Sequence, residues 1–148
     1  MTPKHLLVPT DGSALALKAM AEAVALARPL EARITVLTAE AAVPMPLTGI
    51  GQGLDPALLD SLVAARHQES AAALAAACAL AQAAGIPVGS ERVKDDIPHR
   101  AILAAVGRLG CDLIVMASHG RRGMESLLLG SETQRVLLRA TVPVLVVR

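Results

Sequence analysis

The chain contains no phenylalanine, tyrosine or tryptophan among its 148 residues, although 53% of them are hydrophobic. Its core must therefore be built from aliphatic side chains, mainly those of Ala, Leu and Val. Proteins that bind single-stranded nucleic acid generally stack the bases on aromatic rings, so this absence argues against that class. A bound nucleobase would have to lie against aliphatic side chains and backbone.

The chain also has little net charge and few cysteines. The formal charge of +1 at pH 7 is far below the basic footprint of a nucleic-acid-binding protein, and we expect no nucleic acid partner. Residues 75–148 carry nine basic and six acidic side chains, against five and seven in residues 1–74, which suits a phosphate site in the second half. Cys78 and Cys111 lack the spacing of a metal site or redox pair and are expected to be packing residues.

Long apolar runs and common enzyme signatures are missing as well. No stretch reaches the roughly 18 uncharged apolar residues of a membrane span, and residues 1–5 lack the pattern of a secretory signal. We therefore expect a cytoplasmic protein with no membrane partner. The sequence holds no GxxxxGK[ST], GxSxG or Cys–His signature, and its four histidines show no metal-ligand spacing.

What the sequence does contain is an alternation of short apolar strands with Ala-rich or amphipathic helices. This alternation predicts an α/β fold with a doubly wound, five-stranded parallel sheet and helices on both faces. The length fits a single domain spanning residues 1–148. The expected strands are residues 5–9, 32–38, 88–93 or 94, 113–117 and 142–147, and the expected helices are residues 14–28, 56–84, 97–108 and 131–139.

The stretch from Asp112 to Thr133 organises the chain. The unbroken apolar run of residues 113–117 indicates a strand buried on both faces, and it leads through a glycine-rich loop to Gly130. Ser131 and Gln134 have the spacing of a capping box, which predicts a helix start at this point. Because a helix start presents unpaired N–H groups and a positive dipole end, the loop is expected to cradle an anion such as phosphate.

The spacing Ala117-x2-Gly120-x9-Gly130-Ser131 resembles the nucleotide-binding signature of the universal stress protein family, Gly-x2-Gly-x9-Gly-Ser/Thr, with Ala117 in the position of the first glycine. Family-like segments cover nearly the whole chain: Val8-Pro9-Thr10-Asp11, Ile97-Pro98-His99 and the closing run 142–147. The resemblance implies the sheet order 3-2-1-4-5, ATP as the ligand and a homodimer. With this order, a ligand would bind where the strand order reverses, between strands one and four.

The resemblance also implies roles for individual residues. Asp11 would accept hydrogen bonds from the ribose hydroxyls, or cap the first helix, and the two roles can coexist. The adenine edge would be read by the backbone at Ala39. Pro9, Thr10 and Met116 would form apolar walls, phosphates would lie over the amides of Gly120, Gly130, Ser131, Glu132 and Thr133, and the Ser131 hydroxyl and Arg122 would add donors.

Three details of this site leave alternatives open. The Glu132 carboxylate would compete with phosphate unless a divalent ion such as Mg²⁺ sits between them or the side chain points away. His119 invites a catalytic interpretation, but without a visible partner a role in ordering the loop is favoured. Residues 40–54, which hold two prolines and alternating glycines, form either a lid over the nucleotide or a connector.

These observations favour an ATP-binding regulatory protein of the stress response, with slow ATP hydrolysis at most. A second hypothesis is a nucleotide-free dimeric interaction module of the same fold, which the departures at Ala117 and Glu132 keep open. A third, an adenylyl-transferring enzyme, is disfavoured because no basic or histidine-containing motif follows the first strand. A regulatory protein partner is expected, but the sequence does not identify it.

The last strand, Thr141 to Val147, would lie at one edge of a sheet with the order 3-2-1-4-5. Pro143 suits an edge because proline cannot donate a hydrogen bond to a ladder. The strand is also strongly apolar, and an exposed apolar edge promotes aggregation unless it is covered. Antiparallel pairing with the same strand of a second copy would cover it, so we expect a homodimer through this strand.

Overall fold

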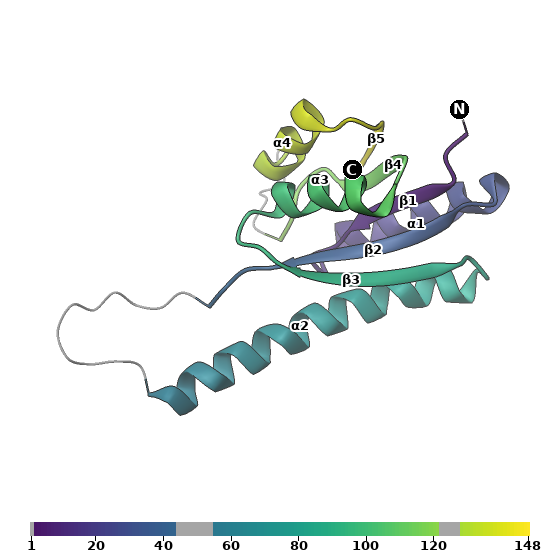
Figure 1. Ribbon diagram of the computed structural model, residues 1–148. Coiled ribbons are helices and arrows are strands. Elements are labelled where there is room, and N and C mark those ends of the chain that lie inside the picture. The colour runs from purple at the N-terminus through teal and green to yellow at the C-terminus, as the bar shows by residue number, and fades with distance from the viewer. Residues whose placement is uncertain (1, 44–54, 122–127) are drawn as a thin grey trace.

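The computed structural model describes residues 2–43, 55–121 and 128–148. Strands and helices alternate along the chain, as predicted, and form a single central sheet with helices on either side (Figure 1). The elements are β1 (His5–Pro9), α1 (Ala14–Leu30), β2 (Arg33–Glu40), α2 (Pro56–Ala83), β3 (Val88–Lys94), α3 (Pro98–Leu109), β4 (Leu113–Ala117), α4 (Ser131–Arg139) and β5 (Val144–Val147).

The sheet has five strands in the order β3-β2-β1-β4-β5, and every neighbouring pair is parallel. The predicted fold class and strand order are therefore confirmed. The order reverses between β1 and β4, where Leu6 pairs with Leu113 and Leu7 with Ile114. The loops that follow these two strands consequently emerge side by side at the carboxyl edge of the sheet.

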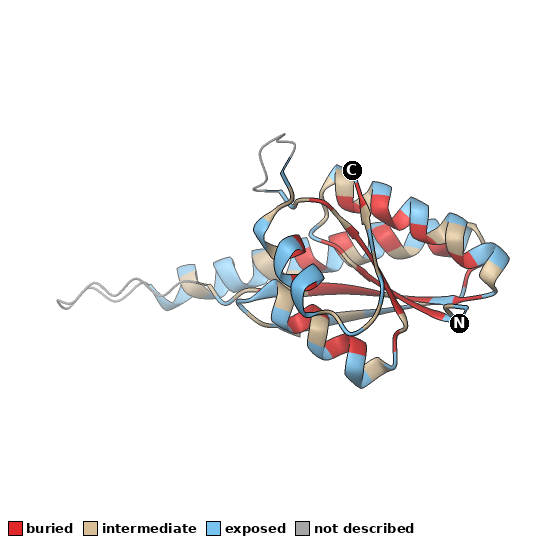
Figure 2. Ribbon diagram, turned by 90° about the horizontal axis from the view of Figure 1, so that it is seen from above, coloured by how far each residue is buried: buried red, intermediate tan, exposed pale blue. Residues whose placement is uncertain are grey.

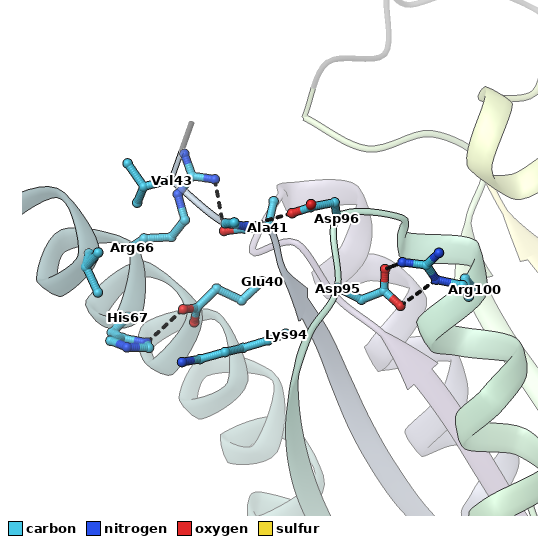
Figure 3. Close-up of a pocket in the computed structure, with 11 residues that line it drawn as sticks. Glu40, Ala41, Val43, Arg66, His67, Lys94, Asp95, Asp96 and Arg100 are labelled. Atoms are coloured by element: carbon cyan, nitrogen blue, oxygen red, sulfur yellow. Dashed lines mark hydrogen bonds and ion pairs between the residues drawn. The ribbon is translucent and has the colours of Figure 1, made fainter. Parts of the chain in front are cut away.

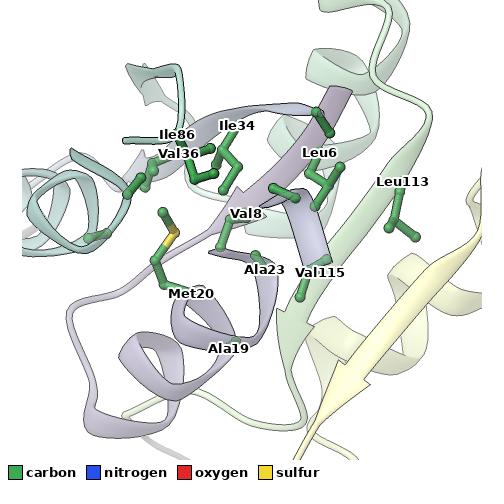
Figure 4. Close-up of a cluster of buried hydrophobic side chains, with 14 of the residues drawn as sticks. Leu6, Val8, Ala19, Met20, Ala23, Ile34, Val36, Ile86, Leu113 and Val115 are labelled. Atoms are coloured by element: carbon green, nitrogen blue, oxygen red, sulfur yellow. The ribbon is translucent and has the colours of Figure 1, made fainter. Parts of the chain in front are cut away.

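Both faces of the sheet are covered, which explains why its central strands are apolar at consecutive positions rather than at alternate ones. Leu6 and Val8 of β1 point into a cluster with α1 and α2, where Met20 of α1 is also fully buried (Figure 4). Leu7, between them, points to the opposite face, into a cluster formed with α3 and α4 that includes Ile102. The aliphatic core expected from the missing aromatic residues is thus divided into two layers.

Three strand boundaries differ from the predicted ones because pairing with neighbours overrides local sequence preference. β2 begins at Arg33, one residue later than expected. β2 continues to Glu40, since Ala39 and Glu40 pair with Val93 and Lys94 of β3. β5 begins only at Val144, two residues later than expected. The predicted loop after the second strand therefore begins after residue 40.

The predicted capping box at α4 is wrong. Gly130, not Ser131, is the N-cap, and it offers no side chain to the helix. The Gln134 side chain donates instead to the carbonyl oxygen of Leu129, at 2.7 Å, while the Gln134 amide donates to the carbonyl of Gly130 at 3.0 Å. α4 starts at Ser131, where the sequence predicted. The main chain of Gly130 caps this start, and Ser131 is exposed.

α2 extends well beyond the sheet at its N-terminal end (Figures 1 and 2). Its first buried residue is Ser70, so residues 56–69 of this helix contribute no fully buried side chain. Across residues 2–43, 55–121 and 128–148, no helix is long and apolar enough to cross a membrane.

Cys111 lies just before β4 and packs into the second core cluster with Ile114 and Val106. Burial raises the pKa of its thiol to about 11, so the thiol stays protonated at neutral pH. Both cysteines are free. Cys78 is half-buried against the first cluster. Both therefore pack against the core, as predicted.

Candidate nucleotide site

The loops after β1 and β4 are joined by the carboxylate of Asp11. Its Oδ1 accepts a hydrogen bond from the amide of Ser13 at 2.9 Å, and its Oδ2 accepts one from the amide of Arg121 at 2.8 Å. The first bond belongs to the turn that starts α1, while the second spans 110 positions of the sequence. Ser13, not Asp11, is the N-cap of α1, since the Ser13 side chain accepts the amide of Ala16. Asp11 instead orders the turn before the cap and makes a contact across the predicted crevice.

The environment of Asp11 keeps it ionised. Burial alone would raise the pKa of this carboxyl, but hydrogen bonds from Ser13 and from the amide of Arg121 outweigh that effect and hold the pKa below its usual range. Each carboxylate oxygen has two acceptor sites, so a bond to one amide leaves room for another donor. A negatively charged acceptor with free lone pairs at this position suits the hydroxyl groups of a ribose.

Hydrogen bonds to residues of β2 hold the backbone of the loop that follows β1. The amide of Thr10 donates to the carbonyl oxygen of Leu37 at 2.8 Å, and the hydroxyl of Thr38 donates to the carbonyl oxygen of Thr10 at 2.9 Å. Both threonines are buried. Thr38 was not among the predicted site residues, because a threonine within a strand gives no sign in the sequence that its hydroxyl restrains a loop on the neighbouring strand.

Gly120 and Gly130 are required for space rather than for unusual backbone angles. A Cβ atom on Gly120 would lie 2.7 Å from Asp11 Oδ2, and one on Gly130 would lie 3.1 Å from the Cα of His119. Neither glycine has a positive φ. Any larger residue at Gly120 would push against the Asp11 carboxylate, and one at Gly130 would push the start of α4 away from the β4 loop.

The amide of Gly130 is already engaged, since it donates to the carbonyl oxygen of Ser118 at 2.7 Å. The prediction that this amide would hold a phosphate is therefore incorrect. The next three amides, of residues 131–133, belong to the first turn of α4 and have no acceptor within the helix. They remain the donors that could receive an anion, together with the positive end of the helix dipole.

Two further bonds fix the direction of those amides. The hydroxyl of Thr133 donates to the carbonyl oxygen of Ala117 at 3.0 Å, which attaches the first turn of α4 to the end of β4. Glu132 turns toward α3, where its Oε2 accepts the amide of His99 at 2.8 Å, and its Oε1 accepts from Arg135 at 2.6 Å. Of the two alternatives considered for Glu132, the structure matches the second, in which the side chain points away from the phosphate position and toward other partners.

The remaining predicted residues are placed as follows. Met116 is buried in the core cluster on the side of α3. The backbone of Ala117 avoids the left-handed region, so alanine at this signature position is not strained. His119 Nδ1 lies 3.2 Å from the hydroxyl of Ser118, a contact within the loop. Pro9 is the last residue of β1, and Ala39 is the last but one residue of β2. Arg122 lies outside the described residues.

Arg121 is a basic residue of this loop that the sequence did not single out. Its amide binds Asp11, and its guanidinium lies so near Gly12 that a Cβ there would approach it to 2.7 Å. Gly12 has a φ of 77°, a left-handed conformation that glycine adopts without strain. The arrangement leaves a cationic side chain over the turn after β1.

Comparison with known proteins agrees with this architecture. The sequence profile of the universal stress protein family matches residues 2–148. The chain belongs to the universal stress protein family. It is 32% identical to a universal stress protein of Methanocaldococcus jannaschii over 148 residues, which are 98% of this chain and 82% of the relative.

Solved structures of universal stress proteins share the fold over almost the full chain. The UspA protein of Lactobacillus plantarum is 25% identical and superposes with a TM-score of 0.79. The match covers 100% of this chain and 99% of that protein. A universal stress protein in complex with cAMP is also 25% identical, with a TM-score of 0.69 and coverage of 100% of this chain and 98% of that one.

Proposed function

We propose that this universal stress protein is a regulatory protein that binds ATP between the loops after β1 and β4. The carrying observation is that one hydrogen bond, from the Arg121 amide to Asp11 Oδ2, joins the two strand ends at the reversal point of the sheet. A ribose acceptor thereby lies beside the loop that leads to α4. The related structure that holds cAMP supports an adenine nucleotide as the ligand.

The proposed contacts follow the chain. Asp11 would accept from the ribose hydroxyls, and the backbone at Ala39 would meet the adenine edge, with Pro9 and Thr10 beside it. The amides of Gly120 and of residues 131–133, with the hydroxyl of Ser131, would hold the phosphates. The glycines fit such a ligand because a side chain at either Gly120 or Gly130 would displace the groups that form the cradle.

Turnover of the nucleotide should be slow at most. His119, the candidate base of the loop, has only the Ser118 hydroxyl as a side-chain partner among the described residues. The Glu132 carboxylate is held by His99 and Arg135, so it is not directed at a water beside the phosphates. Nucleotide occupancy would therefore act by changing the surface that the protein offers to a regulatory partner.

We also propose that the protein is a homodimer formed through β5. Among the described strands, β5 pairs with β4 alone, and no described strand lies along its other edge. Leu145 of this strand and Leu137 and Leu138 of α4 are exposed apolar side chains, with Leu138 at 83% exposure. An open apolar edge flanked by exposed leucines is the kind of surface that a second copy would cover.

The alternative function is a dimeric interaction module that binds no nucleotide. One observation favours it: both Asp11 oxygens and the Gly130 amide already have hydrogen-bond partners within the chain, so the crevice is ordered without a ligand. In the ATP-binding proposal these bonds preorganise the site instead, which reduces the entropic cost of binding.

Native mass spectrometry of the purified full chain, followed by calorimetric titration with ATP, distinguishes the two. Retained or titratable ATP that is lost in Asp11→Ala but kept in Asp60→Ala supports the proposal, because Asp60 is an exposed carboxylate on the projecting part of α2. No binding of ATP, ADP or AMP by a folded wild-type dimer would leave the interaction module as the function.

A further inference from the structure

A cavity lies at the same edge of the sheet as the predicted nucleotide crevice, on the side of β3. It has a volume of about 400 Å³ and is bounded by the ends of β2 and β3, by α2 and by the first turn of α3 (Figure 3). None of the predicted nucleotide-binding residues lines it. Its volume is within the range of sites for small molecules.

The carboxylates of this cavity all have partners. Asp95 is held by two bonds from the guanidinium of Arg100, at 2.6 and 2.9 Å. Asp96 accepts the amide of Ala42 at 2.7 Å. Glu40, whose side chain is only 6% exposed, has its Oε1 2.8 Å from Nδ1 of His67.

Glu40 is a built feature of the cavity wall. Burial would raise the pKa of this carboxyl, but the neighbouring His67 and Ser70 side chains and the charge of Arg92 hold the pKa below its usual range. His67 Nδ1 contacts Glu40 at ion-pair distance without hydrogen-bond geometry. Glu40 Oε2 is buried without a hydrogen bond and lies 3.6 Å from Nε of Arg92, too far for one. The fixed carboxylate orients the His67 ring with Nδ1 toward Glu40, which leaves Nε2 for another partner.

The cations of the cavity are less satisfied than its anions. Arg66 makes one long bond of 3.4 Å, to the carbonyl oxygen of Ala41. The Lys94 side chain, at the end of β3, has no hydrogen bond or ion pair to any residue in the described ranges 2–43, 55–121 and 128–148. Figure 3 shows Arg66, His67 and Lys94 on one side of the cavity and the paired Asp95 and Arg100 on the other.

We propose that this cavity is a second ligand site, which takes a small molecule bearing a carboxylate or phosphate group. The side-chain donors Arg66 and Lys94 line the cavity and lack strong partners. By contrast, Glu40 Oε2, the one described acceptor of the cavity that is buried without a hydrogen bond, is sealed from solvent beside Arg92. The complementary ligand is therefore an anion. The apolar walls formed by Ala42, Val43 and Val63 would cover its carbon skeleton. The site stands independently of nucleotide binding, because it shares no residue with the crevice between β1 and β4.

The test is titration of ¹⁵N-labelled full-length protein with inorganic phosphate and, separately, with succinate, followed by amide chemical shifts. We expect saturable shifts at residues 41–43 and 94–96. Shifts from succinate alone or from phosphate alone would assign the anion class. Shifts confined to residues 10–12, 120 and 131–133 would overturn the second site and leave the nucleotide proposal intact, while the absence of saturable shifts would also overturn it.

The affinity of substituted variants for the anion tests the same site without relying on the positions of the chemical shift changes. Arg66→Gln and Lys94→Gln should each weaken the bound anion about tenfold, as expected for loss of one charge-assisted hydrogen bond. Arg139→Gln, which removes an exposed charge from the last turn of α4, should leave the affinity unchanged. Equal weakening in all three variants would indicate screening by net charge and would overturn the proposal.

Discussion

Glu132 in the first turn of α4 caps the first turn of α3. Its Oε2 lies 2.8 Å from the backbone amide and 2.9 Å from the ring Nδ1 of His99. α3 needs this contact because its own N-cap residue, Ile97, has no side chain that can accept an amide. One carboxylate thus satisfies an orphan donor of α3 and fixes the orientation of the α4 turn proposed to hold phosphate.

A double-mutant cycle should detect this coupling. We expect Glu132→Ala and His99→Ala each to lower the free energy of unfolding by about 1–2 kcal/mol, as for a lost cap or charge-assisted bond. The double variant should lower the free energy of unfolding by clearly less than the sum of the losses in the two single variants. Denaturant unfolding measures all three, and simple additivity would show that the two side chains do not stabilise each other.

The same carboxylate predicts how stability responds to acid. Burial raises the pKa of Glu132, but the bonds from the amide and ring of His99 and from Arg135 outweigh it and lower the pKa below its ordinary value of 4.5. A lowered pKa in the folded state means that the stabilisation is complete above the ordinary value and is lost as the pH falls through the folded value. The melting temperatures of wild type and Glu132→Gln should therefore differ at pH 7 and converge below pH 4.5. A constant difference across this range would contradict the assignment.

The sequence predicted where α4 begins but not how it is held there. The Ser131–Gln134 pattern correctly marked a helix start, because the residues that favour a first turn are local. It could not show that Gly130 would serve as N-cap or that Gln134 would bind Leu129. It also could not pair Glu132 with His99, since a bond between residues 33 positions apart depends on the packing of two helices.

Gly130 offers a direct test of the phosphate cradle. Gly130→Val should abolish measurable ATP binding, because a Cβ would already lie 3.1 Å from His119 Cα and 3.2 Å from the carbonyl oxygen of Ser118. The fold should survive, since the core clusters do not include this residue. Titration with fluorescent ATP measures the effect. Gly107→Val is the matched control, because a Cβ at Gly107 meets nothing within 4 Å, and unchanged affinity in Gly130→Val would place the phosphates elsewhere.

Asp11 tests the other end of the nucleotide. Asp11→Ala should weaken ATP binding by roughly 1.5–3 kcal/mol if the carboxylate binds the ribose hydroxyls. Because Asp11 also holds the amides of Ser13 and Arg121, part of that loss could come from a disordered loop. Comparison with 2′,3′-dideoxy-ATP separates the two effects: the variant should lose little further affinity for this analogue, and an equal loss for both ligands would remove the ribose role.

The strand order and the two-layered core were accessible from the sequence in different ways. The apolar run of residues 113–117 indicated a strand covered on both faces, and the structure places it between β1 and β5. The extension of β2 to Glu40 was not visible, because it depends on pairing with Val93 and Lys94. The cavity beside Glu40 was missed for the same reason, since its residues come from four separate elements.

β5 carries the last prediction, and the structure shows which of its residues face the open edge. The carbonyl oxygens of Pro143 and Val147 accept bonds from Ile114 and Ser118 on the side of β4. Backbone groups alternate in direction along a strand, so those of Leu145 also face β4, while those of Val144 and Val146 face outward. A proline at Leu145 would therefore disrupt the sheet itself, and the residue that tests an edge-to-edge dimer is Val146.

Val146→Pro should convert the proposed dimer into a monomer with nearly unchanged thermal stability of the subunit, because it removes one outward donor and keeps the ladder with β4. Leu145→Pro should instead lower the stability of the fold in addition to any effect on assembly. Light scattering at micromolar concentration gives the mass, and thermal unfolding gives the stability. A wild-type monomer, or an undisturbed dimer in Val146→Pro, would place the interface on another surface, of which the exposed Leu137 and Leu138 of α4 would be the first to examine by substitution with aspartate.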